Sequence, residues 1–365
     1  MGFYFLLKSE KKALFWTGFF IGIFWFYWIS LSFRFYDGLS FLIPFVFVGI
    51  GLFYGLIFYI VAKLSKTVEL RAVFIFLLSF FTPFGFNWLK LELVFINSYF
   101  STNIYLYGVF LALLTLFMRL KKRLKIIPIA ALIGLLFANS QTTPNFPKLN
   151  IALSATNLPQ DKKWNPMYKD EIIRGNFWLI DEAIKQKKDL IVLSESAFPL
   201  YLNIEDKLLE RLKSLSFQIP IVTGALRVQN NRVYNSTFYF NHGKVQIADK
   251  VVLVPFGEQI PFPSFMRDFI NEVFFNGASD YLSASTPTDF EIKGYKFRNA
   301  ICYEATTDEI YKDSPTYIVA LSNNAWFTPS IEPTLQKLLL KLYAKKYNTI
   351  IYHSANSGIS GVILP

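Results

Sequence analysis

The single cysteine of this 365-residue chain is the residue type best suited to covalent chemistry. Cys302 follows the apolar run FRNAI and precedes a polar segment, and the end of a strand can hold a side chain rigidly at a cleft. A lone cysteine in such a position is more often a small buried hydrophobe. A nucleophilic role therefore requires a neighbouring base or cation, because the thiolate is the reactive form.

Few residues can supply that base or cation. The two histidines are His242, in a predicted turn, and His353, on a strand where a core position is expected. Glu195 ends the apolar run DLIVLSE, and Lys250 and Glu258 flank VVLVPFG. Each of these charges alone is more often an ordinary solvated group. Together, however, three segments that end an apolar strand with a charge could converge on one edge of a sheet.

The elements that would position these residues lie in the second half of the chain, where short apolar runs alternate with amphipathic patterns. This alternation, together with hairpins, predicts a layered α/β sandwich. GxGxxG and Walker loops are absent from the sequence, and one cysteine excludes a CxxC zinc or redox site. We expect strands at 149–156, 189–196, 220–226, 232–240, 243–255, 297–304, 316–323, 348–355 and 358–364, and helices at 168–187, 205–216 and 332–347.

The first half of the chain reads as a membrane domain, residues 1–144. Uncharged stretches close to the roughly 20 residues needed to cross the hydrocarbon recur there. A shorter stretch after RLKKRLK completes a set of about five predicted transmembrane helices. The polar linker 139–148 leads into a second domain, residues 145–365. The predicted spans are 13–33, 39–62, 72–89, 103–118 and 126–138.

The basic residues indicate how the membrane domain is oriented. Residues 1–144 carry a net charge of +9 out of +11, and no basic stripe with aromatic residues suggests nucleic-acid binding in the rest. Lys and Arg cluster in alternate connections, and cationic loops stay on the cytoplasmic side. The second domain is then extracytoplasmic. The cytoplasmic set is Lys8, Lys11, Lys12, Lys63, Lys66, Arg71, Arg119, Lys121, Lys122, Arg123 and Lys125, against Arg34 and Lys90 outside.

Several motifs resemble those of the apolipoprotein N-acyltransferases, which are integral membrane members of the nitrilase (carbon-nitrogen hydrolase) superfamily. They are SESAFP, DKVVLVPFGEQIPF, ICYE and NNAWFTPS, and the resemblance covers nearly the whole chain. It implies a multi-pass α-helical membrane domain followed by an α-β-β-α sandwich. It also implies a general base, an oxyanion-stabilising lysine and an acylated cysteine. The matching positions are Glu195, Lys250 and Cys302, with supporting or substrate-binding roles for Glu258, Tyr303, Glu304, Trp164 and Trp326.

The resemblance further implies a two-step reaction without cofactor or metal. The cysteine would take an acyl chain from the sn-1 ester of a phospholipid and pass it to the N-terminal amine of a diacylglyceryl-cysteine in an apolipoprotein. Both partners are lipids, which leave a bilayer only at a cost of about 0.8 kcal/mol per CH₂. We therefore expect a monomeric enzyme of the bacterial inner membrane with a periplasmic catalytic domain.

Departures from the family pattern keep two rival interpretations open. The chain ends at Pro365, directly after GISGVI, so we expect a catalytic domain shortened at its C-terminus and a membrane domain shortened at its N-terminus. Asn324 stands where the family usually has Asp, and Gln336-Lys337 where it has Gln-His. The rivals are a membrane-anchored nitrilase-type amidase and an inactive lipid-binding relic. A lipid substrate is favoured by phenylalanines that could dip into the bilayer surface, Phe262, Phe265, Phe269, Phe274 and Phe275.

Overall fold

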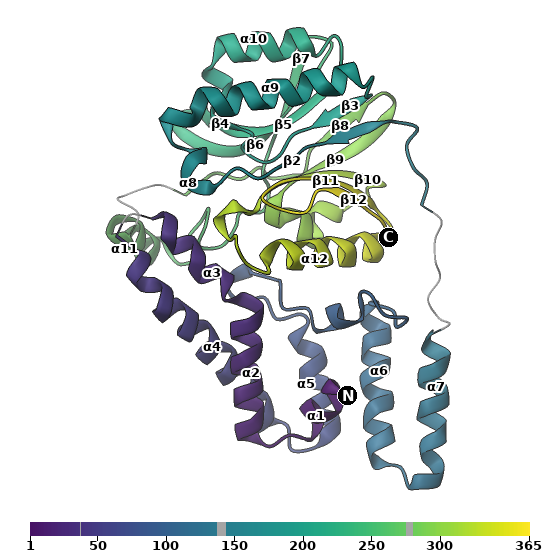
Figure 1. Cartoon of the computed structure of the whole chain (residues 1–365). Coiled ribbons are helices and arrows are strands. Elements are labelled where there is room, and N and C mark those ends of the chain that lie inside the picture. Colours follow the sequence, from purple (N-terminus) through teal and green to yellow (C-terminus); the bar gives the residue numbers. More distant parts are fainter. Residues whose placement is uncertain (37, 137–143, 275–279) are drawn as a thin grey trace. The chain divides into compact units, whose positions relative to one another are not determined.

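A computed structural model describes residues 1–36, 38–136, 144–274 and 280–365, except for the side chains of residues 269, 270, 273 and 274. The chain divides into two compact units, Met1–Thr143 and Pro144–Pro365 (Figure 1). The first unit is built from helices and the second from two sheets with flanking helices. The helices of the first unit are α1 (Gly2–Lys8), α2 (Lys11–Phe26), α3 (Trp28–Leu31), α4 (Ile43–Leu64), α5 (Val68–Leu78), α6 (Ile104–Arg119) and α7 (Ile126–Leu136).

The apolar helices of the first unit have lengths suited to a membrane. Ser40–Leu64 and Val68–Gly85 are long and apolar enough to span one, and Lys11–Phe26 with Trp28–Phe35 would form a third span bent by 44°. Ile104–Arg119 is a shorter apolar helix. Because Ser, Thr and Pro interrupt the sequence after Leu78, α5 itself ends there. The predicted span 72–89 is therefore helical only in its first part, and residues 137–138 of the last predicted span lie outside the described residues.

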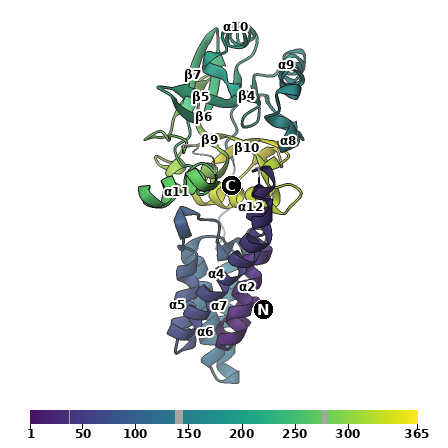
Figure 2. The ribbon, with the colours of Figure 1, turned by 90° about the vertical axis from the view of Figure 1, so that its left-hand side faces the viewer.

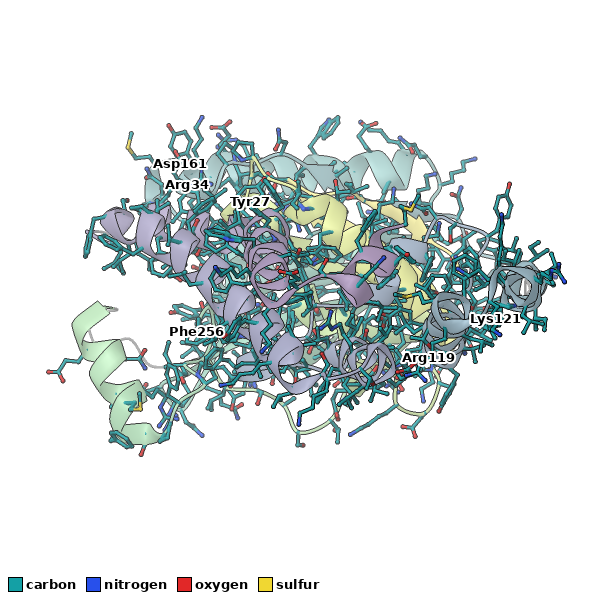
Figure 3. All side chains as sticks on the ribbon, turned by 90° about the horizontal axis from the view of Figure 1, so that it is seen from below. Tyr27, Arg34, Arg119, Lys121, Asp161 and Phe256 are labelled. Carbon is teal, nitrogen blue, oxygen red and sulfur yellow. The ribbon has the colours of Figure 1, made fainter. Side chains whose placement is uncertain are left out.

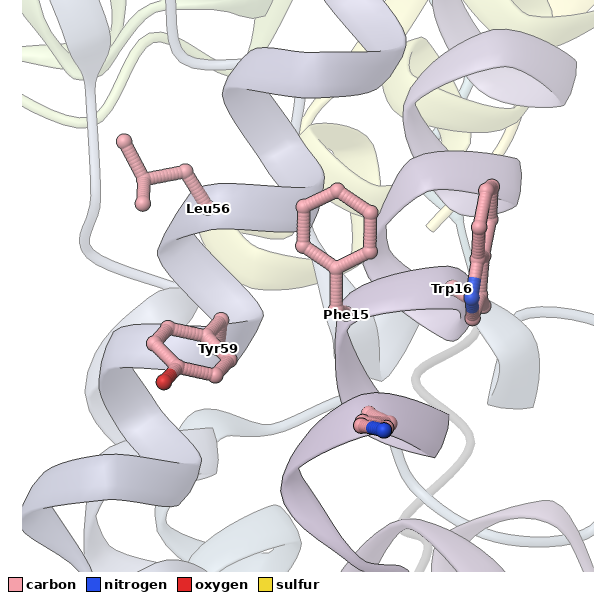
Figure 4. Close-up of a pocket in the computed structure, with 5 residues that line it drawn as sticks. Phe15, Trp16, Leu56 and Tyr59 are labelled. Atoms are coloured by element: carbon pink, nitrogen blue, oxygen red, sulfur yellow. The ribbon is translucent and has the colours of Figure 1, made fainter.

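Glycines allow α2 and α4 to pack closely. A Cβ added at Gly18 would lie 2.5 Å from the Tyr54 carbonyl oxygen, and one at Gly22 would lie 2.9 Å from the Ile50 carbonyl oxygen. Only a residue without a side chain fits at such positions, where small residues are the usual helix contact in membranes. Beside this seam lies a pocket of about 340 Å³, lined mainly by aromatic and aliphatic side chains of both helices (Figure 4). Its lining residues are Lys12, Phe15, Trp16, Leu56 and Tyr59.

Basic residues gather at the connection between α6 and α7. Arg119 and Lys121 belong to this connection (Figure 3), and the short 3₁₀ segment Lys122–Lys125 adds further basic residues. Arg71 joins another connection, since its guanidinium donates hydrogen bonds to the carbonyl oxygens of Leu7 (3.1 Å) and Ser9 (2.5 Å). These cations lie at helix ends, as expected of residues that anchor spans at a membrane surface.

The second unit contains two mixed sheets. In the first, the strand order is β1-β3-β5-β6-β7, with β4 also paired to β5; in the second it is β12-β11-β10-β9-β8, with β2 paired to β11. The first sheet contains β1 (Ile151–Leu153), β3 (Leu190–Val192), β4 (Phe198–Tyr201), β5 (Ile221–Gln229), β6 (Arg232–Asn241) and β7 (Lys244–Asp249). The second contains β2 (Ala155–Thr156), β8 (Asp289–Ile292), β9 (Tyr295–Ile301), β10 (Tyr317–Asn323), β11 (Ile350–Asn356) and β12 (Gly361–Ile363).

The sheets pack face to face between two layers of helices (Figures 1 and 2). Leu190 and Val192 of β3 join Phe297 and Val319 in the core between the sheets, whereas the intervening Ile191 packs under α9 (Lys169–Lys185) and α10 (Asp206–Leu215). α12 (Glu332–Tyr347) covers the outer face of the second sheet. The central strands are therefore buried on both faces, which explains their uninterrupted apolar sequences. This α-β-β-α sandwich confirms the predicted fold class.

Several predicted strands are shorter than expected or divide, and the strand expected over 189–196 ends at Val192. Residues 149–156 form two short strands in different sheets, separated at Ser154, whose hydroxyl hydrogen-bonds that of Ser354 (2.8 Å). The strand expected over 243–255 ends at Asp249, and the one expected over 297–304 ends at Ile301. These two strands were predicted to be longer because the sequence stays apolar after the chain has left the sheet. Lys250 and Cys302 are consequently the first residues beyond their strands.

The phenylalanines predicted to reach a bilayer are only partly described. Phe265 lies on α11 (Ser264–Phe274) and is 73% exposed, whereas Phe262 is half-buried. The side chains of residues 269 and 274, and the whole of residue 275, lie outside the described part of the chain. The bilayer contact therefore stays a prediction.

Candidate active site

Cys302 lies on a sharp turn between β9 and the 3₁₀ segment η8 (Cys302–Thr306). Its φ of 54° is in the left-handed region, which residues with a side chain seldom adopt. The carboxylate of Glu304 holds the turn, because its Oε1 accepts a hydrogen bond from the Ile301 N–H (2.7 Å). The nucleophile candidate is thus fixed by its own strand end and remains partly exposed.

Glu304 also ties this turn to the segment that carries Lys250. Its Oε2 accepts hydrogen bonds from the backbone N–H groups of Val251 (2.7 Å) and Val252 (3.0 Å). Burial raises the pKa of Glu304 to about 7, although Lys250 and the three backbone N–H groups act in the opposite direction. The buried side chain of Glu304 therefore fixes the position of the turn that carries Cys302 relative to the segment that carries Lys250.

Lys250 is fully buried beside Glu258. Its Nζ lies 2.7 Å from Glu258 Oε2, and among the described residues it has no hydrogen bond of good geometry. Burial alone would lower the pKa of this amine, but Glu258 and then Glu195 outweigh that effect and raise it. Glu258 is itself held by the Val254 N–H, which donates to Oε2 (2.9 Å). The structure thus holds a charged ammonium inside the site with donor capacity left over.

Glu195 lies just beyond β3, in a turn that passes close to β5. A Cβ at Gly224 would lie 2.7 Å from Glu195 Cα, so only glycine fits opposite this turn. The side chain of Asn235 links the two carboxylates, because its Nδ2 donates to Oε1 of Glu195 and to Oε1 of Glu258, each at 2.8 Å. Burial raises the pKa of Glu195; Lys250 opposes this change and Glu258 adds to it.

A second lysine lies behind Glu195. The buried Lys163 donates from Nζ to the Glu195 carbonyl oxygen (2.9 Å). Burial lowers the pKa of Lys163 to about 8, against the effect of Glu195. Neither Lys163 nor Asn235 was among the residues predicted from sequence. Lys163 has no local signal, because it lies in the polar segment QDKKW, and the NST triplet that contains Asn235 in RVYNSTFYF does not indicate what its amide faces.

The environment of Cys302 keeps its thiol protonated. Burial and then the charge of Glu195 raise its pKa well above the ordinary value, while Lys250 lowers it; Glu332 and Glu258 add smaller increases. Glu195 and Lys250 therefore lie close enough to Cys302 for their charges to act on its thiol, as expected from the positions of all three near strand ends. A neutral resting thiol needs a base at the moment of attack.

The remaining predicted residues surround this cluster more loosely. Tyr303 is buried next to the cysteine, at 3% exposure. Trp164 is 40% exposed at the end of the short helix α8 (Gln160–Lys163), and Trp326 is half-buried in the 3₁₀ segment η10 (Asn324–Trp326). A role for the tryptophans at the substrate stays a prediction.

The histidines do not join the site. His242 lies in the turn between β6 and β7, with a φ of 46°. His353 is buried in β11, where its ring nitrogens contact the Ile359 carbonyl oxygen (3.0 Å) and the Ser322 hydroxyl (2.9 Å). Burial lowers its pKa to about 4. His353 is therefore a neutral core residue. Across the described residues, no group of three or more His, Cys, Asp or Glu side chains is arranged to hold a metal ion.

Comparison with known proteins identifies the family. Residues 1–138 match the apolipoprotein N-acyltransferase integral membrane domain, and residues 131–359 match the carbon-nitrogen hydrolase domain. An apolipoprotein N-acyltransferase of Wolinella succinogenes is 46% identical over 99% of this chain and 87% of its own length. The chain belongs to the apolipoprotein N-acyltransferase family. The Helicobacter pylori member is 41% identical over 98% of this chain and 85% of its own length.

Membership of this family makes the chain a membrane-bound acyltransferase. The family predicted from its sequence motifs is thereby confirmed. Among solved structures, a CN-hydrolase superfamily protein from Xanthomonas campestris is 15% identical, covering 59% of this chain and 78% of its own, with a TM-score of 0.43. The two family models that match this chain describe a membrane domain and a carbon-nitrogen hydrolase domain.

Proposed function

We propose that this enzyme transfers a fatty acyl chain from a phospholipid to the N-terminal amine of a diacylglyceryl-cysteine in apolipoproteins, through a thioester on Cys302. The observation that carries the proposal is the convergence of a thiol, a buried carboxylate and a buried ammonium at three strand ends. Glu195 and Glu258 share the amide of Asn235, and Lys250 pairs with Glu258 at 2.7 Å. These groups suit a base, a nucleophile and an oxyanion partner.

In the first half-reaction, Cys302 Sγ attacks the carbonyl carbon of the sn-1 ester while its proton moves to Glu195. The carbonyl oxygen gains a negative charge, and the Nζ of Lys250 stabilises it. Collapse of this intermediate breaks the bond between the carbonyl carbon and the glycerol oxygen. Glu195 returns the proton to that oxygen, so the products are a lysophospholipid and an S-acyl cysteine.

In the second half-reaction, the α-amine of the lipoprotein attacks the thioester carbonyl carbon. Glu195 takes a proton from the attacking nitrogen, and Lys250 again faces the oxyanion. Breakage of the carbon–sulfur bond forms the amide, and the proton returns to the sulfur. A tuned carboxylate can serve both steps because each begins and ends with an ionised Glu195, and the thiol that becomes a thioester in the first step is restored in the second.

The test is acylation of the only cysteine. The full chain in detergent micelles is incubated with phosphatidylethanolamine vesicles, and its intact mass is followed. We expect a gain of one fatty-acyl group that disappears in Cys302→Ala and on addition of a diacylglyceryl peptide. A folded protein that never gains this mass would overturn the proposal. Loss of the acyl group to water without a peptide would instead support the amidase alternative.

We further propose that the enzyme is a monomer of the bacterial inner membrane with its catalytic domain in the periplasm. The orientation is supported by the charge bias, with eleven Lys and Arg in the connections assigned to the cytoplasm and two in those assigned to the other side. A reporter fused after residue 122 should be cytoplasmic, and one fused near residue 145 should be periplasmic. Finding both reporters on one side would contradict this topology.

A further inference from the structure

A second polar cluster lies beside Cys302 and takes no part in the acyl transfer described above. Glu332 is the first residue of α12, Gln336 follows one turn later, and Asn324 begins η10. Their side chains are almost completely buried, at 1%, 1% and 0% exposure. Burial of a carboxyl and two amides is costly unless their hydrogen bonds are satisfied, so the arrangement of those bonds carries information.

Asn324 orients the amide of Gln336. Its Nδ2 lies 3.0 and 2.8 Å from the two carboxylate oxygens of Glu332 and 2.9 Å from Gln336 Oε1. An amide nitrogen carries two hydrogens, so one is donated to the carboxyl group of Glu332 and the other to Gln336. With its oxygen engaged in this way, Gln336 turns its Nε2 toward Cys302 Sγ, at 3.8 Å.

We propose that Gln336 is a hydrogen-bond donor that stabilises the Cys302 thiolate, and that Glu332 and Asn324 are positioning residues that fix the direction of its amide. Without them, the Gln336 side chain could rotate and present its oxygen to the sulfur. An oxygen there would repel a thiolate, whereas an N–H stabilises it. The proposal rests on Cys302 being the nucleophile of the proposed function.

A carboxyl group is suited to this position only if it seldom carries charge near the sulfur. Burial raises the pKa of Glu332 to about 8, while Asn324 acts in the opposite direction and Glu195 adds to the increase. At neutral pH the group is therefore mostly protonated, and its carbonyl oxygen still accepts from Asn324. The charged and titratable groups that face Cys302 are Glu195 from beyond β3, Lys250 and Glu258 from beyond β7, and Glu332 from α12.

The proposal is tested by the pH dependence of Cys302 alkylation in the full chain in detergent micelles. Iodoacetamide is the reagent, and because the chain has one cysteine, the intact mass reports that residue alone. Gln336→Met removes the donor but preserves the shape of the side chain. We expect the apparent thiol pKa to rise by about 0.5 to 1 unit, which slows alkylation at pH 7 by about three- to tenfold.

Two substitutions at Glu332 separate positioning from packing. Glu332→Leu removes the acceptor for Asn324 and should slow alkylation as Gln336→Met does. Glu332→Gln keeps that acceptor and should restore the wild-type rate at pH 7. Equal alkylation profiles for the two Glu332 variants would overturn the positioning role, even if Gln336→Met could not be obtained folded.

Gln160→Met is the matched control. Gln160 is also a buried glutamine whose Oε1 accepts from an asparagine, here Asn323 (2.9 Å). The same substitution there should lower the unfolding temperature but leave the alkylation profile of Cys302 unchanged. A folded Gln336→Met variant with the wild-type profile would refute the proposal. Because no phospholipid is present, this result is independent of whether acyl transfer occurs.

Discussion

Removal of the Asn235 amide should shift the pH dependence of cysteine acylation. Its Nδ2 donates to Glu195 and Glu258, each at 2.8 Å, and so holds two carboxylates side by side. Asn235→Leu keeps a similar volume and removes both donors. The ionised form of Glu195 then loses a hydrogen bond, and the charge of Glu258 is no longer shielded from it. Both effects raise the pKa of Glu195 further.

The size of this pKa shift follows from the energy of the one hydrogen bond that Glu195 loses. A hydrogen bond to a charged group contributes about 1.5 to 3 kcal/mol, and one pKa unit corresponds to about 1.4 kcal/mol. Loss of the bond to Glu195 should therefore raise its pKa by about one to two units. Lys250 is retained in this variant, and its positive charge still favours the ionised form of Glu195, so this base still loses its proton at higher pH. A base with a raised pKa is inactive over a wider acidic range, so activity falls mainly at low pH.

The assay is the single-turnover rate of Cys302 acylation by phospholipid, measured from about pH 5 to 9. In Asn235→Leu, the acidic limb should move to higher pH by about one to two units, with a smaller change on the plateau. Asn176→Leu is the control, since that buried amide donates to the Ala197 carbonyl oxygen (2.6 Å) and not to a carboxylate. An acidic limb that stays in place, or moves to lower pH, in a folded variant would refute this reasoning.

Three further perturbations have defined outcomes. Lys250→Met should slow acylation by about 10²- to 10³-fold in the same assay, and a rate within a few-fold of wild type would exclude it as the oxyanion partner. Gly224→Ala would place a Cβ 2.7 Å from Glu195 Cα and should cost about 1 to 3 kcal/mol in unfolding, unlike Gly175→Ala, whose Cβ meets no atom within 4 Å. Burial lowers the pKa of His353 from 6.5 to about 4, so stability should be full above about pH 6.5 and fall by about 3 kcal/mol toward pH 4. His353→Gln should flatten this loss in thermal unfolding.

The strand ends could be predicted because burial on both faces leaves an uninterrupted apolar run, and a charge after that run marks the sheet edge. Glu195 was found in this way, whereas Lys250 fell within the strand expected over 243–255 and Cys302 was singled out as the one cysteine of the chain. The resemblance to the family supplied the predicted roles of all three. The exact ends of the strands were not predicted, since VVLVP after Lys250 is as apolar as a strand but leaves the sheet at Asp249. Apolarity reports burial, and residues that leave a sheet can remain buried.

The polar partners of these residues could not be predicted because each depends on contacts between distant segments. Asn235 lies within β6 and joins carboxylates 40 residues earlier and 23 residues later in the chain. Glu332 occupies a first-turn position where an acidic residue usually faces solvent and the helix dipole, yet it is buried. Local patterns carry no information on which strand end a buried amide will face.

The charges of the site suit a reaction that moves one proton back and forth. Lys250 pairs with Glu258, and Lys163 contacts the backbone of Glu195, so a buried cation lies beside each of these two carboxylates. Transfer of the thiol proton to Glu195 moves a negative charge from oxygen to sulfur and leaves the total unchanged. Attack on a neutral ester then carries that charge to the carbonyl oxygen, where an ammonium with spare donors is already fixed. Because no step adds charge to the site, both half-reactions can proceed among buried groups without the cost of a new uncompensated ion.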